Sequence, residues 1–135
     1  MAERVAGLGG IFFRARDPDA LRVWYAEHLG IEMEDYGTTF KAVEGDQTVW
    51  APFAADTDYF GPSGQQLMVN YRVRDLDAML EQLRASGIQV DERVHDMEFG
   101  RFGWAVDPEG NRFELWQPPG EEPVKPADPG SAPRR

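Results

Sequence analysis

Hydrophobic and polar positions in the first part of the chain predict a strand followed by a helix. Positions 10–16 include Ile11, Phe12 and Phe13, and this β-branched and aromatic content is typical of a strand. Asp17 and Pro18 then mark a helix start, because an Asp side chain accepts hydrogen bonds from free backbone N–H groups and proline suits the first helical position. Gly30 is placed to end this helix. At a spacing of three and four residues, one buried helical face is formed by Leu21, Trp24, Tyr25, His28 and Leu29.

The second half of the chain begins with the same pattern. A strand is predicted over 66–73, and Asp75 begins a helix that Gly87 ends. The letters ARDPDA at 15–20 align with VRDLDA at 73–78, a shift of 58 residues. The apolar face of the second helix carries Leu76, Met79, Leu80 and Leu83. Further short strands are predicted at 31–36, 39–43 and 48–52 in the first half, and at 88–94, 102–106 and 112–117 in the second.

Each half therefore has the order β-α-β-β-β, and the sequence predicts an α+β domain built from two tandem modules. The modules span about 8–53 and 66–117 within a domain of residues 1–117, joined by a crossover over 54–64. Each module is too small to hold a good core alone, so the two are expected to pair. Residues 118–135 contain six of the ten prolines and almost nothing apolar, which predicts a disordered tail.

The composition excludes several classes of protein. The 135 residues carry 14 basic and 24 acidic side chains, and the net charge of −10 argues against a nucleic-acid or anionic-membrane partner. The chain has no cysteine and two histidines, which excludes disulfides, thiolate nucleophiles and cysteine-based zinc sites. No apolar run approaches the roughly 20 residues of a membrane span. We therefore expect a soluble cytoplasmic domain.

Several motifs resemble those of the vicinal oxygen chelate superfamily, which includes glyoxalase I, extradiol dioxygenases and bleomycin-binding proteins. The motifs are Phe13-x-x-x-Asp17, Trp24-Tyr25-x-x-x-Leu29-Gly30, and the run DPEGNRFEL at 107–115. The resemblance implies that each module forms a curved half-sheet, with its helix on the convex face and the site in a concave cup. It also implies a homodimer, because open sheet edges are prone to association.

Metal-dependent members of that superfamily have four ligand positions, and the resemblance places them here at Gly10, Trp50, Met68 and Glu114. Only Glu114 offers an oxygen ligand, whereas a catalytic metal needs about three protein ligands. We therefore predict no cofactor. The alternative is a divalent metal held by Glu114 together with a shifted ligand such as Gln47, Gln66 or Asp56.

Strand alternation predicts which side chains line the cup. Ile11, Phe13, Ala15, Val69, Tyr71 and Val73 are expected to face the helices. The opposite face is expected to form an aromatic site with a few polar groups, a composition typical of small-molecule pockets. Its predicted ligand-binding residues are Phe12, Arg14, Trp50, Met68, Asn70, Arg72, Trp104, Glu114 and Trp116.

Each of these residues also has a purely structural interpretation. The tryptophans can fill the core, Met68 can pack, and the two arginines can pair with carboxylates at the rim. Glu114 can serve as a structural hydrogen-bond acceptor. Glu114 and His95 are the candidate catalytic groups, with His95 placed in a loop bordering the cup.

Three functions remain open. The favoured one is metal-independent binding of an aromatic or cationic small molecule, because aromatic walls stack planar ligands and an acidic surface attracts cations. The second is a metal-dependent lyase, isomerase or dioxygenase that uses Glu114. The third is a metal-free enzyme that uses Arg14, Arg72 or His95 on a polar substrate.

Overall fold

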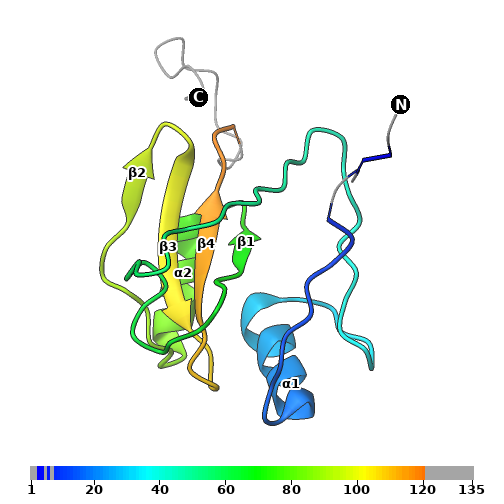
Figure 1. The fold of residues 1–135 in the computed structure, drawn as a ribbon. Helices are drawn as coiled ribbons and strands as arrows, with labels where there is room; N and C mark the ends of the chain where they lie inside the picture. Colours follow the sequence, from blue (N-terminus) through cyan, green and yellow to red (C-terminus); the bar gives the residue numbers. More distant parts are fainter. Residues whose placement is uncertain (1–2, 5, 7, 121–135) are drawn as a thin grey trace.

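The computed structural model describes residues 3–4, 6 and 8–120. It contains two helices and a four-stranded mixed sheet, drawn in Figure 1. The helices are α1 (Pro18–Leu29) and α2 (Leu76–Ala85), and the strands are β1 (Asn70–Arg72), β2 (His95–Met97), β3 (Gly100–Val106) and β4 (Arg112–Gln117). The strand order is β1-β4-β3-β2, with β1 parallel to β4 and the other pairs antiparallel. The predicted α+β class with a curved mixed sheet is confirmed.

Both helices begin where the sequence predicts. The Asp17 carboxylate accepts from the backbone N–H of Ala20, and the Asp75 carboxylate accepts from that of Ala78. Each cap satisfies one of the N–H groups that the first helical turn leaves free. Gly30 ends α1 at φ 70°, a left-handed conformation that favours glycine.

The core lies between α2 and one face of the sheet. Leu76, Leu80 and Leu83 are almost fully buried against the strands. Their partners on β3 and β4 are Ala105, Phe113 and Leu115. Each leucine side chain buried in this way contributes about 1.5–3 kcal/mol relative to exposure. This packing fixes which face of the sheet remains for a site.

Helix α1 is attached to the second half of the chain by the turn between β3 and β4. The Tyr25 hydroxyl donates to Asp107 at 2.8 Å, and both groups are buried. The Glu109 carboxylate accepts from the backbone N–H groups of Arg16 at 2.7 Å and Asp17 at 2.8 Å. Because of these contacts, α1 lies beside β1 (Figure 1).

The second half forms the predicted β-α-β-β-β unit, with altered strand bounds. β4 matches the prediction, whereas the strand predicted at 66–73 forms only as β1. The segment predicted as a strand at 88–94 makes only a bridge between Val90 and Ala105. A strand forms instead at β2, so His95 lies in a strand rather than in the predicted loop.

The strands predicted in the first half do not form. Residues 8–69, all of which the structure describes, contain no strand and only one bridge, between Glu34 and Gly37. The predictions at 10–16, 31–36, 39–43 and 48–52 are therefore wrong for a single chain. A strand needs a hydrogen-bonding neighbour, and a lone extended segment in water has none.

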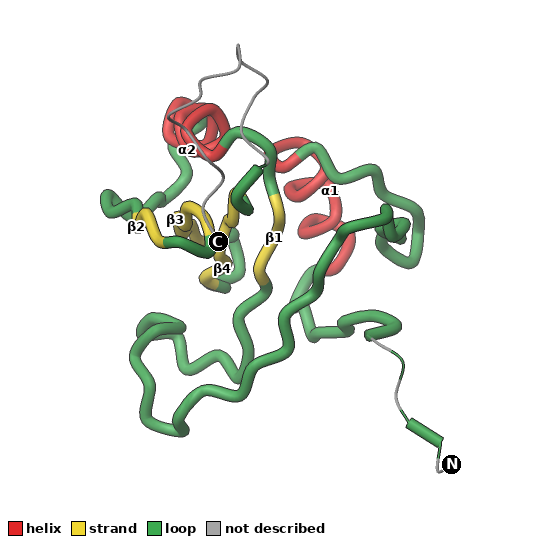
Figure 2. The backbone as a smooth tube through the Cα atoms, turned by 90° about the horizontal axis from the view of Figure 1, so that it is seen from above, coloured by secondary structure: helices red, strands yellow, loops and turns green. Residues whose placement is uncertain are grey.

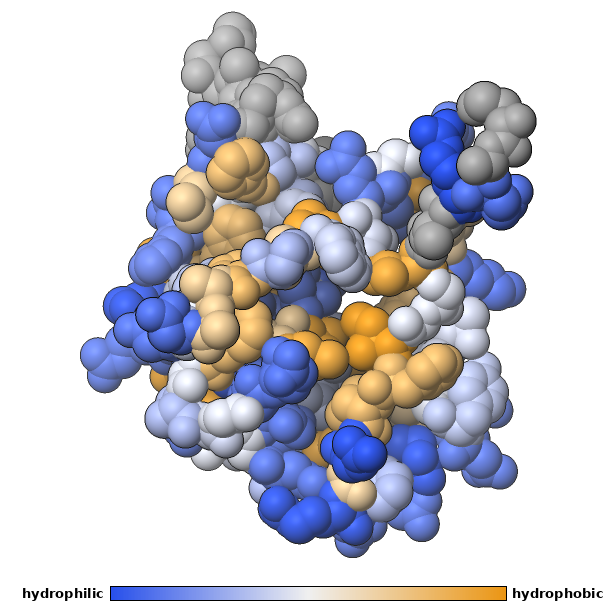
Figure 3. All heavy atoms as spheres, in the orientation of Figure 1, coloured by the Kyte–Doolittle hydropathy of each residue, from blue (hydrophilic) through white to orange (hydrophobic). Residues whose placement is uncertain are grey.

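The apolar side chains of the first half are consequently exposed. Ile11 and Phe13, predicted to face the helices, each expose 49 % of their surface. Figure 2 shows both helices on one side of the strands and long loops on the other. In Figure 3, hydrophobic side chains surround an opening in the middle of this face.

No helix among the described residues is long and apolar enough to cross a membrane. Most of the predicted tail at 118–135 lies outside the described residues.

Candidate functional site

The face of the sheet opposite α2, which we call the cup face, carries side chains from three strands. In β4, Phe113 and Leu115 point into the core, so Glu114 and Trp116 lie on the other face. The same face receives Asn70 and Arg72 from β1 and Phe102 and Trp104 from β3, which pair with these β4 residues in register. The predicted alternation of the second half is therefore the observed one.

Glu114 is the centre of the cup face. Its side chain is a buried carboxylate, and the residue exposes 7 % of its surface. One carboxylate oxygen accepts from the Asn70 amide Nδ2 at 2.7 Å, and the other accepts from the Trp104 indole Nε1 at 3.0 Å and from the Tyr59 hydroxyl. Three neutral donors thus replace the water that a buried carboxylate loses.

Trp104 forms the floor of the site and is 1 % exposed. Tyr59 and His95 meet its ring edge to face, with centroids 5.9 Å and 5.0 Å away. The guanidinium carbon of Arg112 lies 5.2 Å from the ring centroid, within the range of a cation–π interaction. Two aromatic side chains and one cation therefore surround this indole.

Tyr59 reaches the cup from the crossover between the two halves. Its ring stacks on Phe53 with centroids 5.4 Å apart and an interplanar angle of 18°, and Phe53 also contacts Phe60. Burial, together with the hydrogen bond to Glu114, raises the pKa of the Tyr59 hydroxyl above its ordinary value. The phenol therefore stays protonated and acts as a donor to the carboxylate.

A cavity of about 160 Å³ lies beside this group. It is lined by Asp58, Tyr59, Arg93, His95, Trp104 and Arg112. Asp91 pairs with Arg93 at 3.0 Å and with Arg112 at 3.5 Å, and the Arg93 hydrogen bonds hold the pKa of Asp91 well below its usual range. Asp91, together with Asp58 beside Arg93, thus offsets the charges of the two arginines. His95 lines the cavity, and its catalytic role remains a prediction.

The structure brings only part of the predicted site together. Phe12 and Trp50 expose 93 % and 76 % of their surface, and Arg14 is also exposed, so these three predicted ligand-binding residues do not line the cup of a single chain. Met68 is half-buried. The reason is the missing strands of the first half, which were to carry Phe12, Arg14 and Trp50.

Two other predicted residues lie at the rim of the cup face. Arg72 pairs with Asp46 at 3.1 Å and donates to the Gln47 carbonyl oxygen at 3.1 Å. Trp116 stacks on Phe102 with centroids 6.2 Å apart and an angle of 8° between the rings. Its indole N–H donates to the Phe99 carbonyl oxygen. The stacked rings of Phe102 and Trp116 therefore extend the aromatic surface of the cup face towards β2.

Four residues that line the cavity were not predicted as site residues: Asp58, Tyr59, Arg93 and Arg112. Arg112 has the same parity as Glu114 on β4, so strand alternation could have found it. Tyr59 lies in a segment that reads as a loop. Its only signal was a pair of adjacent aromatic residues, Tyr59 and Phe60, in an otherwise polar crossover.

The four positions that the superfamily uses for a metal do not form a metal site here. Gly10 has no ligand atom, Trp50 is exposed, and Met68 offers only a thioether. Both oxygens of Glu114 already accept hydrogen bonds. Among the described residues, no three His, Asp or Glu side chains come together in a way that could hold an ion. The donor set does not fit a catalytic divalent metal.

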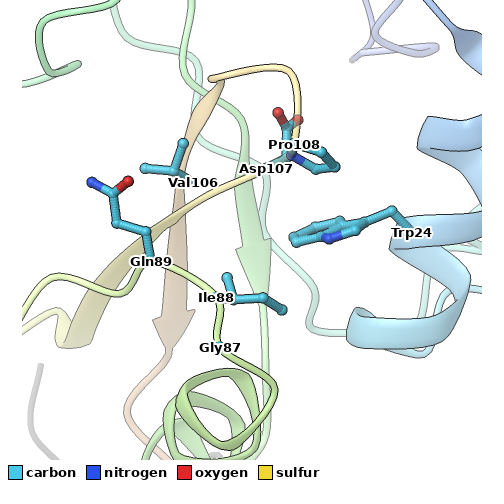
Figure 4. A pocket seen from close by; sticks show the side chains of 7 residues that line it. All are labelled: Trp24, Gly87, Ile88, Gln89, Val106, Asp107 and Pro108. Carbon is cyan, nitrogen blue, oxygen red and sulfur yellow. The ribbon is translucent and has the colours of Figure 1, made fainter.

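A second cavity, of about 260 Å³, lies on the other side of the sheet, beside α1 (Figure 4). Trp24 and Ile88 form its apolar wall, and Asp107 is its carboxylate. That carboxylate already accepts hydrogen bonds from Tyr25 and Asn111. We place the candidate site in the smaller cavity, because aromatic rings, two arginines and a histidine converge there.

Comparison with known proteins agrees with this architecture. Residues 10–116 match the family of the Glyoxalase-like domain. The chain belongs to this glyoxalase-like family. The match confirms the vicinal oxygen chelate superfamily that the sequence motifs indicate. No curated protein matches the glyoxalase-like chain.

Solved structures with TM-scores above 0.5 share the fold of this glyoxalase-like chain. A member of the glyoxalase/bleomycin resistance protein/dioxygenase superfamily from Sphaerobacter thermophilus is 20 % identical, with a TM-score of 0.53 over 84 % of this chain and 98 % of its own. A lactoylglutathione lyase from Agrobacterium tumefaciens is 18 % identical, with a TM-score of 0.52 over 88 % and 97 %. TnmS3, an antibiotic-binding protein from a Streptomyces species, is 25 % identical, with a TM-score of 0.49 over 77 % and 88 %.

Proposed function

We propose that this chain binds a planar aromatic small molecule in its cup without a metal. The supporting observation is the state of Glu114, whose two oxygens are held by Tyr59, Asn70 and Trp104. A carboxylate bonded in this way is a fixed hydrogen-bond acceptor rather than a free metal ligand. Aromatic rings surround it, as in most small-molecule sites.

The charges of the site favour a neutral aromatic ligand over a cationic one. Arg112 already lies over the Trp104 ring, so a ligand cation at that ring would have to displace the guanidinium. The net charge of −10 attracts cations to the molecule as a whole, and a cationic ring system therefore remains the second form of the ligand.

Fluorescence titration tests this proposal. Because Trp104 is buried beside the cavity, a planar aromatic ligand is expected to quench tryptophan emission saturably. Trp104→Phe should remove most of this quenching, whereas Trp24→Phe, on α1, should leave it. Absence of saturable quenching by a panel of planar neutral and cationic compounds would contradict the proposal.

Metal analysis separates binding from the metal-dependent alternative, a lyase, isomerase or dioxygenase. The purified protein is incubated with Mn²⁺, Fe²⁺, Ni²⁺ or Zn²⁺, dialysed and analysed for bound metal. We expect no stoichiometric metal. Stoichiometric metal that disappears in Glu114→Ala would overturn the metal-independent proposal and support the enzyme.

We also propose that the chain forms a homodimer. Its support is the exposure of large apolar side chains along the first half, including Phe12 at 93 %, Val49 at 70 % and Trp50 at 76 %. Such an accumulation of exposed apolar surface is typical of an interaction surface. A second copy offers both the strand partners that these segments lack and a symmetric interface. Sedimentation equilibrium should give the mass of two chains, and a monomer at micromolar concentration would contradict the dimer.

A further inference from the structure

We infer that the ligand of the cup is a phenol, whose neutral hydroxyl replaces that of Tyr59 as a donor to Glu114. The inference rests on the proposed function and adds the chemical class of the ligand. Tyr59 is itself a phenol, and it occupies the cup from a loop of the same chain. Its contacts therefore show which ligand chemistry the site accepts.

Each part of the Tyr59 side chain contacts a different group of the site. The hydroxyl donates to the Glu114 carboxylate, and the ring meets Trp104 edge to face and stacks on Phe53. The cavity that Tyr59 lines is also lined by His95. A planar ring with one hydroxyl at its edge would satisfy the same three contacts.

The Glu114 carboxylate explains why the ligand needs a hydroxyl group. Glu114 is buried, and its other two donors, Asn70 and Trp104, belong to the sheet and remain in place. If a ligand displaced Tyr59 without donating a hydrogen bond, one lone pair of a buried carboxylate would lose its partner. A hydrogen bond to a charged group corresponds to a preference of about tenfold or more for the donor.

The ligand hydroxyl is expected to stay protonated. Burial beside the Glu114 carboxylate raises the pKa of the Tyr59 phenol, and a ligand phenol at the same place experiences the same environment. A phenolate or carboxylate is disfavoured, because it would face the Glu114 charge while Asp91 and Asp58 already offset the charges of Arg93 and Arg112. The site therefore selects a neutral donor rather than an anion.

The Tyr59 side chain can leave without unfolding its surroundings. Its backbone is held separately, by the Arg112 Nε donating to the Tyr59 carbonyl oxygen at 3.1 Å and by the Tyr59 N–H donating to the Thr57 hydroxyl at 3.2 Å. The side chain itself is held by its hydrogen bond to Glu114 and by ring contacts, and the residue is half-buried. A rotamer change is therefore enough to vacate the cup.

The volume of the cavity agrees with displacement of the Tyr59 ring by a ligand. A space of about 150 Å³ holds one benzene ring, and the cavity of about 160 Å³ is of that size with Tyr59 in place. Drug-sized ligands need pockets of about 300 Å³ or more. Removing the phenol ring of Tyr59 adds room for a second fused ring, so a two-ring phenol is a suitable test compound.

Equilibrium dialysis of the full chain against 2-naphthol and its methyl ether, 2-methoxynaphthalene, tests the inference. The two compounds share the ring system, and only the first donates a hydrogen bond. We expect 2-naphthol to bind about tenfold or more tightly than the ether. Tyr59→Phe should increase the affinity for both compounds several-fold, because the side chain at position 59, which competes with the ligand for the cup, loses its hydrogen bond to Glu114. Tyr36→Phe, an exposed tyrosine bonded to Thr39, is the matched control and should change neither affinity.

The outcomes separate this inference from the proposed function. If both compounds bind with equal affinity, or if Tyr59→Phe leaves both affinities unchanged, the phenol inference is overturned while aromatic binding stands. If neither compound nor any other planar aromatic binds, the proposed function fails and the inference fails with it. Glu114→Gln, checked for its fold by circular dichroism, should reduce the preference for 2-naphthol, and an unchanged preference would also overturn the inference.

Discussion

Two buried carboxylates each accept a hydrogen bond from a tyrosine in a distant part of the chain. Glu114 binds Tyr59 of the crossover, and Asp107 binds Tyr25 of α1. Both tyrosines have raised pKa values, chiefly because burial disfavours the charged phenolate. Each tyrosine therefore remains a donor at physiological pH and links a segment of the first half to the second.

At the residue scale, Tyr25→Phe is expected to destabilise the protein by about 1–3 kcal/mol, the cost of removing a donor from a buried charged acceptor. Tyr25 and Asp107 expose only 5 % and 4 % of their surface, so water does not replace the lost hydroxyl. Urea unfolding measures the change. Tyr36→Phe serves as the control, since Tyr36 is 70 % exposed and should lose almost nothing. Equal stability of the two variants would contradict this role of Tyr25.

At the scale of the elements, the turn between β3 and β4 holds the start of α1. The Glu109 carboxylate accepts two backbone N–H groups, from Arg16 and Asp17, and these hydrogen bonds lower the pKa of Glu109 below its ordinary value of 4.5. The carboxylate also lies at the positive end of the helix dipole. Helix α1 is therefore docked by a carboxyl group that binds these two N–H groups best in its ionised form.

The lowered pKa of Glu109 sets the sign of its pH dependence. A carboxyl whose pKa is lower in the folded state stabilises that state above its unfolded pKa, and this contribution is lost as the pH falls through the folded value. Glu109→Gln should therefore be less stable than the unsubstituted protein near neutral pH, and the gap should narrow below about pH 4.5. Urea unfolding at several pH values measures the gap. Glu81→Gln, exposed on α2, should show no such trend.

At the scale of the whole molecule, the two halves of the sequence repeat form different structures. The second half forms its sheet, because β1 and β4 pair in parallel and α2 covers the apolar face. The first half keeps only α1 and leaves its extended segments unpaired. Since both halves carry the same kind of pattern, the difference lies in the partners available within one chain.

Substitutions on the extended segments test the proposed dimer at this scale. Phe12→Ser and Trp50→Ser should weaken association by about tenfold or more each, if either side chain is buried against a second copy. Sedimentation velocity over a range of concentrations measures the dissociation constant. Val23→Ser is the matched control, because Val23 is 64 % exposed on α1, away from these segments. Similar effects of all three substitutions would contradict an interface on the extended segments.

The sequence by itself determined the helices, the β-α-β-β-β order of the second half and the parity of its strands. These features depend on caps, glycine positions and alternation, which act between neighbours along the chain. This local pattern correctly predicted that Asn70, Trp104 and Glu114 share one face. The same pattern predicted strands in the first half that do not form. Alternation shows that a segment is suited to a strand, but it does not show whether another strand lies beside it.

The tertiary structure alone decided what meets Glu114. Tyr59 is 55 residues away from Glu114 along the chain, and no periodic pattern connects a loop tyrosine to a strand carboxylate. The same holds for Glu109, which is 93 residues from the backbone N–H of Arg16 that it accepts. A carboxylate accepts from whichever donors the packed chain brings within hydrogen-bond distance, and the fold rather than the neighbouring residues decides which donors these are.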